Sequence, residues 1–92
     1  MTRVLYDPAA PDMVFSGHAG AGTYGQDPVC AALSMLMFTL LEALPAEGVE
    51  RHLADGYCRV RGGAGGPYAV IAAGLRRLEK DYPAYVKLEV KT

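Results

Sequence analysis

Polar and apolar residues alternate in several short runs of the sequence, a pattern with a period of two that is typical of half-buried β-strands. Four runs show it clearly: residues 2–6, 13–16, 56–61 and 85–90. A proline-bearing segment separates the first two runs, which therefore predict a hairpin. Residues 49–53 are ambiguous and leave an additional strand open.

Two longer segments have the features of helices. In the first, Asp27 is a good N-cap and Pro28 suits the first helical position, so we expect a helix from Pro28 through Leu44 that ends near Pro45. Its apolar residues cover nearly the whole circumference, and such a helix must be covered on all sides.

The second helix is predicted from Pro67 to about Lys80, after a glycine-rich connection over residues 62–66. Its apolar stripe and its outward-facing residues are separated at helical spacing. The stripe comprises Val70, Ile71, Gly74, Leu75 and Leu78, and the outward set comprises Arg76, Arg77, Glu79 and Lys80.

The predicted order of elements is β-β-α-β-(β)-α-β. It favours an α+β fold in which two helices pack on a four- to five-stranded mixed or antiparallel sheet, as one domain over residues 1–92. In so short a chain, one sheet and one neighbouring helix do not cover the first helix completely. We therefore expect a homodimer that buries its remaining face.

Composition excludes several other classes of protein. The 92 residues are 51% hydrophobic and 21% charged, which is ordinary for a globular domain and excludes disorder. Two cysteines are too few for a disulfide framework, so a cytoplasmic location is expected. The apolar run over residues 28–41 is too short to span a membrane, and the first residues lack the apolar core of a secretory signal.

The charges argue against a general nucleic-acid-binding function, because the formal net charge is only −1. They are unevenly distributed along the chain, however. Residues 1–50 hold one Arg and six acidic residues, whereas residues 51–92 hold eight Lys and Arg and four acidic residues. Arg59, Arg61, Arg76, Arg77 and Lys80 are interpreted as a solvated surface.

Cys30 is the first candidate for chemistry. With Asp27 as the N-cap, Cys30 lies in the first helical turn, where the helix dipole and free amides favour a thiolate. Ser34 is four residues further, on the same face, and can support the thiolate. Asp27 either caps the helix or orients a catalytic base. The alternative is that Cys30 is only a small apolar residue of the helix.

His18 is the candidate base. It lies where the second strand passes into the glycine-rich segment 17–26, twelve residues before Cys30. A flexible loop can fold back so that imidazole and thiol meet as general base and nucleophile, the minimal set for acyl transfer. Backbone amides of the loop and of the first helical turn are expected to stabilise an oxyanion. A lone histidine is, however, often a bystander.

Two other interpretations of these residues are weaker. Residues 20–25 match the GxGxxG dinucleotide-binding pattern, but no convincing parallel strand with a ribose-binding acid follows. His18, Cys30, His52 and Cys58 are spaced without a Cys-x-x-Cys knuckle, so no metal site is expected. Cys58 is expected in the core and His52 on the surface.

Three stretches of the sequence together resemble a known family. They are SGHAG at residues 16–20, YGQDPVCAALS at residues 24–34 and DYPAYV at residues 81–86. The chain is similar to the ribosomal-processing cysteine protease family, Prp, whose pattern is S-G-H-A-G, a short glycine-bearing loop and G-x-D-I-V-C-A-A-V-S. Pro28 stands where the family has Ile, a change that the first helical position tolerates.

The resemblance implies a small homodimeric protease that removes the N-terminal extension of a ribosomal protein, the twenty-seventh of the large subunit. It makes Cys30 the nucleophile and His18 the general base and acid, with Asp27 and Ser34 in support and no cofactor. It also implies a mobile loop over the substrate, with the residues Ala19, Gly20, Gly22, Tyr24, Gly25 and Gln26. The alternative is a non-catalytic ribosome-assembly or protein-binding module that retains the motif.

Overall fold

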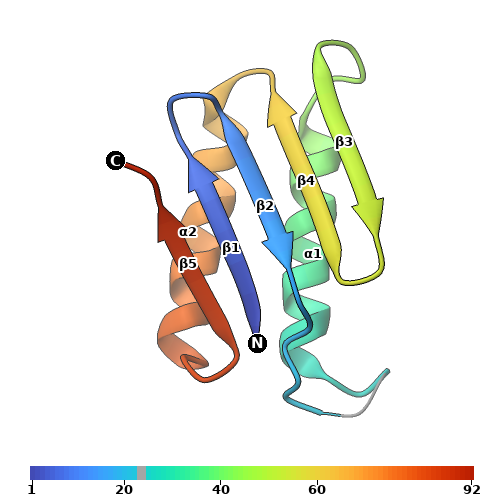
Figure 1. Cartoon of the computed structure of the whole chain (residues 1–92), viewed down its shortest axis with the longest axis vertical. Coiled ribbons are helices and arrows are strands. Elements are labelled where there is room, and N and C mark those ends of the chain that lie inside the picture. Colours follow the sequence, from blue (N-terminus) through green and yellow to red (C-terminus); the bar gives the residue numbers. More distant parts are fainter. Residues whose placement is uncertain (23–24) are drawn as a thin grey trace.

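The computed structural model describes residues 1–22 and 25–92 of the chain (Figure 1). Its elements follow the predicted order, with a strand at the ambiguous segment. They are β1 (Thr2–Asp7), β2 (Asp12–Ser16), α1 (Pro28–Ala43), β3 (Val49–Ala54), β4 (Tyr57–Gly62), α2 (Gly65–Asp81) and β5 (Val86–Val90). The chain is a single α+β unit, and most predicted boundaries agree within two residues.

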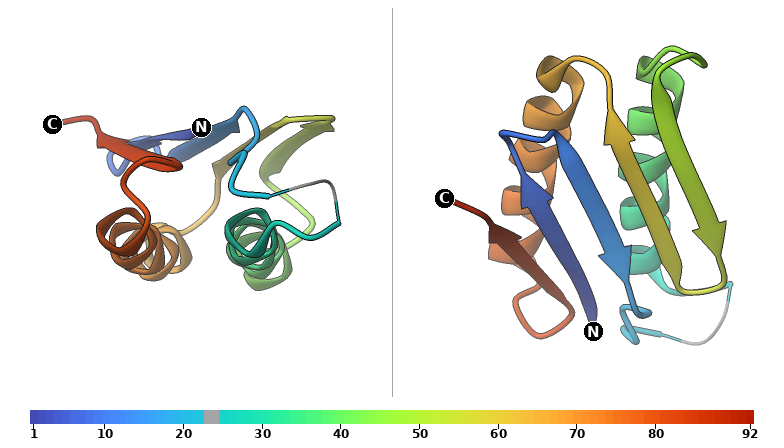
Figure 2. Two further views of the ribbon diagram at one scale, coloured as in Figure 1. Left: turned by 90° about the horizontal axis from the view of Figure 1, so that it is seen from below. Right: turned by 45° about the horizontal axis from the view of Figure 1, so that its top comes forward.

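The five strands form one mixed sheet in the order β3-β4-β2-β1-β5. β1 pairs in parallel with β5, and the other neighbouring strands are antiparallel. Both helices lie side by side on the same face of this sheet (Figure 2). The predicted two-helix arrangement on a mixed sheet is therefore confirmed. The GxGxxG segment follows a strand with only antiparallel neighbours, unlike a dinucleotide-binding βαβ unit.

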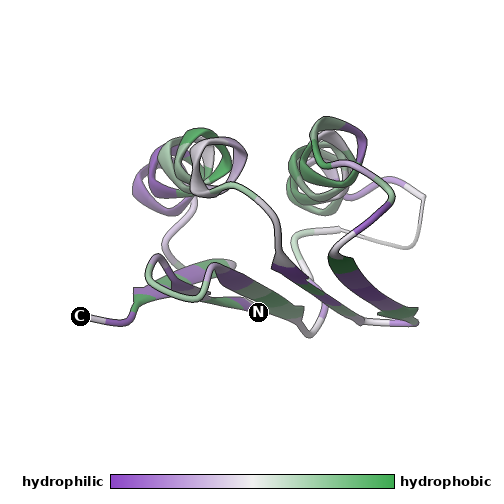
Figure 3. Cartoon of the chain, turned by 90° about the horizontal axis from the view of Figure 1, so that it is seen from above, coloured by the Kyte–Doolittle hydropathy of each residue, from purple (hydrophilic) through white to green (hydrophobic). Residues whose placement is uncertain are grey.

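The hydrophobic core fills the space between the sheet and the two helices. Val4, Met13 and Val60 from the strands and Leu40 and Leu75 from the helices are fully enclosed. Figure 3 shows both helices on one side of the sheet. Because strand residues alternate between the two faces, the period-two pattern in the sequence records which positions are covered.

The start of α2 differs from the prediction. The helix begins at Gly65, so two glycines assigned to the connection belong to its first turn. Pro67 is then the third helical residue, where a missing N–H costs little because the amides of the first turn have no partner within the helix.

Two side chains of α2 also differ from the prediction. Val70 belongs to the predicted apolar stripe but is exposed, whereas the buried side of the helix is formed by Tyr68, Ile71 and Leu75. Glu79 was expected to face solvent, but its carboxylate accepts the N–H of Leu88 at 2.8 Å. This contact fastens the end of α2 to β5.

α1 is only partly covered within one chain. Val29, Leu33 and Leu40 are buried, but Met35 and Phe38 are 68% and 50% exposed. The homodimer that was expected to cover this helix stays a prediction. Neither helix of the described chain is long and apolar enough to cross a membrane.

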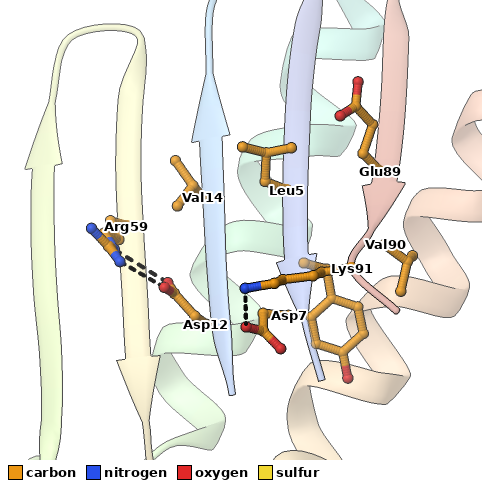
Figure 4. Close-up of a pocket in the computed structure, with 9 residues that line it drawn as sticks. Leu5, Asp7, Asp12, Val14, Arg59, Glu89, Val90 and Lys91 are labelled. Carbon is orange, nitrogen blue, oxygen red and sulfur yellow. Dashed lines mark hydrogen bonds and ion pairs between the residues drawn. The ribbon is translucent and has the colours of Figure 1, made fainter. Parts of the chain in front are cut away.

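The other face of the sheet is open and carries paired charges. A cavity of about 570 Å³ on this face is lined in part by two ion pairs (Figure 4). Arg59 binds Asp12 at 2.7 Å, and Lys91 lies 3.7 Å from Asp7. Cys30 does not contribute to this cavity. The candidate chemistry lies elsewhere, at the end of the sheet near the start of α1.

Candidate active site

The start of α1 fixes the position of Cys30. Asp27 has extended backbone angles, and its Oδ1 accepts the N–H of Val29 at 3.0 Å and that of Cys30 at 2.9 Å. Asp27 is therefore the N-cap that the sequence predicts, followed by Pro28 at the first helical position. Cys30 is the third residue of the helix and is half-buried.

The same carboxylate holds the preceding loop against the helix. Oδ2 of Asp27 accepts the N–H of Ala21 at 2.9 Å, and Ala19 is buried in the core. A Cβ at Gly22 would lie 2.9 Å from the carbonyl oxygen of Gln26, so the loop is closed too tightly for a side chain there. The contacts that the structure shows for Asp27 are thus a helix cap and a loop anchor.

These contacts lower the pKa of Asp27. The first cause is the hydrogen bond from the Cys30 amide, which stabilises the carboxylate, and the bonds from Ala21 and Val29 act in the same direction. They also correct one expectation, because the amides of Val29 and Cys30 are not free to bind an oxyanion. Among the described loop residues, the amides of Ala21 and Gly22 also bond to Asp27, so the remaining described loop amides stay candidates.

His18 is positioned by the sheet. β2 and β4 pair from Asp12↔Arg61 to Ser16↔Tyr57, and the N–H of Gly17 then donates to the carbonyl of Gly56 at 2.8 Å. The antiparallel pairing thus continues one residue beyond β2, and His18 leaves its end. The carbonyl of Gly17 also accepts the hydroxyl of Thr2, at 3.2 Å. The backbone before the imidazole is therefore held by two strands.

The structure brings His18, Cys30 and Ser34 together around two adjoining cavities. One, of about 290 Å³, is walled by Leu33, Phe38 and other apolar side chains. The other, of about 550 Å³, extends along the glycine loop and includes Asp27. Both cavities are lined by His18, Cys30 and Ser34, so a peptide lying here would meet the thiol and the imidazole at once.

The loop residues, the second cysteine and the second histidine were also singled out from the sequence, and they lie in different parts of the structure. Gly20, Gly22 and Gly25 line the second cavity, and their role as a loop over a substrate stays a prediction. Tyr24 lies outside the described residues. Cys58 is buried in the core as predicted, where burial raises the pKa of its thiol, and His52 is exposed as predicted. In the described part of the chain, no group of three or more His, Cys, Asp or Glu could hold a metal ion.

Sequence reasoning missed Asp55. This residue lies in the turn between β3 and β4, and its Oδ1 is 3.6 Å from Nε2 of His18. The dipeptide Asp55-Gly56 between two extended runs is a hairpin signal that could have revealed the turn. It could not have revealed the contact with His18, which depends on β4 pairing with β2.

A thiol at a helix start, with an imidazole on the same cavity, is the combination of groups that cysteine peptidases use as nucleophile and base. The particular family follows from the sequence: residues 8–87 match the family "Cysteine protease Prp". This match covers most of the chain, which therefore belongs to the Prp family of cysteine proteases. Among curated proteins, no sequence matches the chain.

Solved structures show the same fold. An essential ribosomal processing protease Prp from S. aureus, in complex with a covalently linked product peptide, has a TM-score of 0.87 and 24% identity over 99% of this chain and 100% of that chain. The S. aureus Prp with a substrate peptide has a TM-score of 0.74 and 22% identity, over 98% and 97% of the two chains. SMU.848 from Streptococcus mutans is 21% identical, with a TM-score of 0.68 and coverage of 99% and 92%.

Proposed function

We propose that this chain is an endopeptidase that removes the N-terminal extension of the twenty-seventh protein of the large ribosomal subunit, with Cys30 and His18 as a catalytic dyad. The observation that carries the proposal is that both side chains line the same two cavities. Membership of the Prp family supports the cysteine-protease chemistry. The similar S. aureus enzyme, a ribosomal processing protease solved with peptides, supports the substrate class.

In the proposed reaction, His18 takes the proton of the Cys30 thiol, and Sγ attacks the scissile carbonyl carbon. The protonated imidazole then gives its proton to the leaving amine, which departs and leaves an acyl group on Sγ. Water, deprotonated by His18, hydrolyses this thioester and restores the thiol. Loop amides are the proposed oxyanion donors, and Ser34, one turn after Cys30, supports the thiolate.

The N-cap makes the imidazole important for activating the thiol. A helix N-terminus favours an anion, but Asp27 already places a carboxylate there and occupies the amides of Val29 and Cys30. The thiolate therefore depends on a positive partner nearby. In the proposed mechanism His18, which lines both cavities with Cys30, is that partner once it carries the proton.

Charge fits the proposed substrate. The first 50 residues, which supply His18, the loop and Cys30, hold six acidic residues and one Arg. Asp27 lines the site, whereas Asp7 and Asp12 are ion-paired on the other face of the sheet. Segments of ribosomal proteins are typically basic because they contact RNA phosphates, and opposite charge speeds encounter. The glycine loop, residues 19–26, is proposed to close over the bound peptide.

Two further features belong to the proposal. The exposed Met35 and Phe38 of α1 support a homodimer that buries this helix, which sedimentation equilibrium of the native chain tests directly. A chain that stays monomeric at high micromolar concentration would contradict it. Both cysteines are free thiols, which fits the reducing cytoplasm.

The test is cleavage of a peptide that spans the junction between the extension and the mature ribosomal protein. The parent is expected to cut it once, whereas Cys30→Ala and His18→Ala should abolish detectable turnover. Cys58→Ala is the matched control, since it removes the other thiol, which is buried in the core, and should still cleave. Cleavage that survives loss of Cys30 contradicts the mechanism. A folded parent that binds the peptide without cutting it would instead indicate a non-catalytic binding module.

A further inference from the structure

The sheet places a carboxylate opposite the imidazole of His18. The paired positions of β2 and β4 run to Ser16↔Tyr57, and the hydrogen bond from Gly17 to Gly56 continues the register. The next opposed pair in that register consists of His18 and Asp55. Their juxtaposition is therefore set by main-chain pairing, and the carboxylate Oδ1 lies 3.6 Å from Nε2 of the ring.

Gly56, which follows Asp55 in the turn, leaves room for the His18 ring beside the turn. Gly56 has a φ of +69°, and a Cβ built there would lie 2.9 Å from Nε2 of His18. The turn lies this close to the ring because the position has no side chain, and a Cβ there would require the ring to move. Asp55, His18 and Cys30 all line both cavities of the site, so the carboxylate borders the space that a peptide would occupy.

From this geometry we infer that Asp55 is a positioning residue, which holds the His18 imidazole with Nε2 toward its carboxylate and leaves Nδ1 for the Cys30 thiol. The inference rests on the proposed function. A carboxylate that accepts one ring N–H fixes which nitrogen is free to act as a base, and it stabilises the imidazolium that forms during the reaction. The hydrogen bonds that the structure shows for Asp27 are instead with the backbone amides of Ala21, Val29 and Cys30.

Solvent exposure determines at which stage the contact between Asp55 and His18 affects the reaction. The side chains of His18 and Asp55 are 60% and 96% exposed, so water screens their attraction in the free protein. A peptide across the cavities excludes part of that water, and catalytic contacts that are long in a free enzyme shorten in the substrate complex. The effect of Asp55 should therefore appear in kcat more than in KM.

The experiment compares Asp55→Ala, Asp55→Glu and the control Glu47→Ala, which removes another exposed acidic residue outside both cavities. Asp55→Ala is expected to lower kcat about 3- to 10-fold with KM within about twofold, because the attraction of the exposed pair is weak in the free protein and strengthens when the substrate covers it. Asp55→Glu should recover part of the loss, and Glu47→Ala should match the parent. Unchanged kcat in Asp55→Ala, a loss confined to KM, or no recovery with Glu overturns the inference.

A second measurement separates this inference from the proposed substrate. Alkylation of Cys30 by iodoacetamide at neutral pH reports thiolate formation without any peptide. His18→Ala and Asp55→Ala should both slow it, the latter by about threefold, while Glu47→Ala should not. If the parent fails to cut the ribosomal peptide but alkylation follows this order, the substrate is wrong and the role of Asp55 stands. Alkylation that is indifferent to Asp55 contradicts that role.

Discussion

Gly56 offers a direct test of whether the position of the His18 ring controls activity. A methyl group at Gly56 would lie 2.9 Å from Nε2 of His18, whereas ordinary contacts begin at 3.4 Å. The imidazole is the exposed end of a side chain and can move aside, so the clash itself costs little stability. Relief of the clash shifts the ring by about 0.5 Å, which is enough to disturb proton transfer.

The magnitude follows from how steeply catalysis depends on alignment. A misplacement of about 1 Å costs about 100-fold in rate, so a shift of about half that size should cost about tenfold. This corresponds to about 1.4 kcal/mol in the activation barrier. Gly56→Ala also forces alanine into the left-handed region, which costs about 1 kcal/mol of folding stability.

Gly48→Ala is the matched control because it carries the same backbone cost without the contact. Gly48 has a φ of +75°, and a Cβ there meets nothing within 4 Å. Thermal unfolding should show a similar decrease in Tm for both variants, about 4–8 °C. Peptide cleavage at a temperature where both are folded should show the tenfold loss of kcat/KM only in Gly56→Ala. Equal activity of the two folded variants would refute the claim that ring position limits the rate.

Three further outcomes are expected. Asp27→Asn should lower the thermal stability at neutral pH. Because folding lowers the pKa of Asp27, its carboxylate stabilises the folded state above its unfolded pKa of about 4. In thermal melts, the difference in Tm between parent and variant should therefore shrink as the pH falls through the pKa of Asp27 in the folded state. Native protein should take up one equivalent of iodoacetamide, at Cys30, because burial raises the pKa of the Cys58 thiol and encloses it; mass spectrometry that finds Cys58 labelled without unfolding would contradict this. Tyr68→Phe should lower the free energy of unfolding in urea by about 1 kcal/mol. The substitution removes the hydroxyl that donates to the carbonyl of Gly62 at 2.7 Å. An unchanged free energy of unfolding would show that this bond contributes nothing.

The elements that the sequence predicts well are those whose signal is local. Asp27-Pro28 is a cap and a first helical residue, and both are where the pattern puts them. β1 and β4 alternate because one side of each strand lies in the core and the other faces solvent. Such signals need only neighbouring residues, so they can be recognised without knowledge of the tertiary structure.

β3 shows why one strand was ambiguous. It lies at the edge of the sheet and is exposed at nearly every position, so burial leaves no alternation in its sequence. Arg51, near its middle, donates to the carbonyls of Leu44 and Pro45 beyond the end of α1. These contacts place the strand beside the helix without requiring apolar residues. A pattern based on hydrophobicity cannot detect such a strand.

Among the residues of the candidate site, too, those with a local sequence signal were predicted and the one without such a signal was missed. His18, Asp27, Cys30 and Ser34 carry a motif, and the structure gathers them at one end of the fold. Asp55 carries no motif, because its relation to His18 exists only through the pairing of β4 with β2, about forty residues apart in the chain. Strand order depends on which long-range pairing buries the most apolar surface. It cannot be read from any one segment.

The thiol and the imidazole are held by separate supports. Cys30 belongs to a helix whose first turn is fixed by Asp27, and His18 follows directly from the β2–β4 pairing. The glycine loop joins them but is tied to the helix by the bond from Ala21 to Asp27. Because each support is formed by its own hydrogen bonds, the loop can be rich in glycine without determining where the two side chains lie. This separation explains how a glycine-rich loop can coexist with fixed positions for Cys30 and His18.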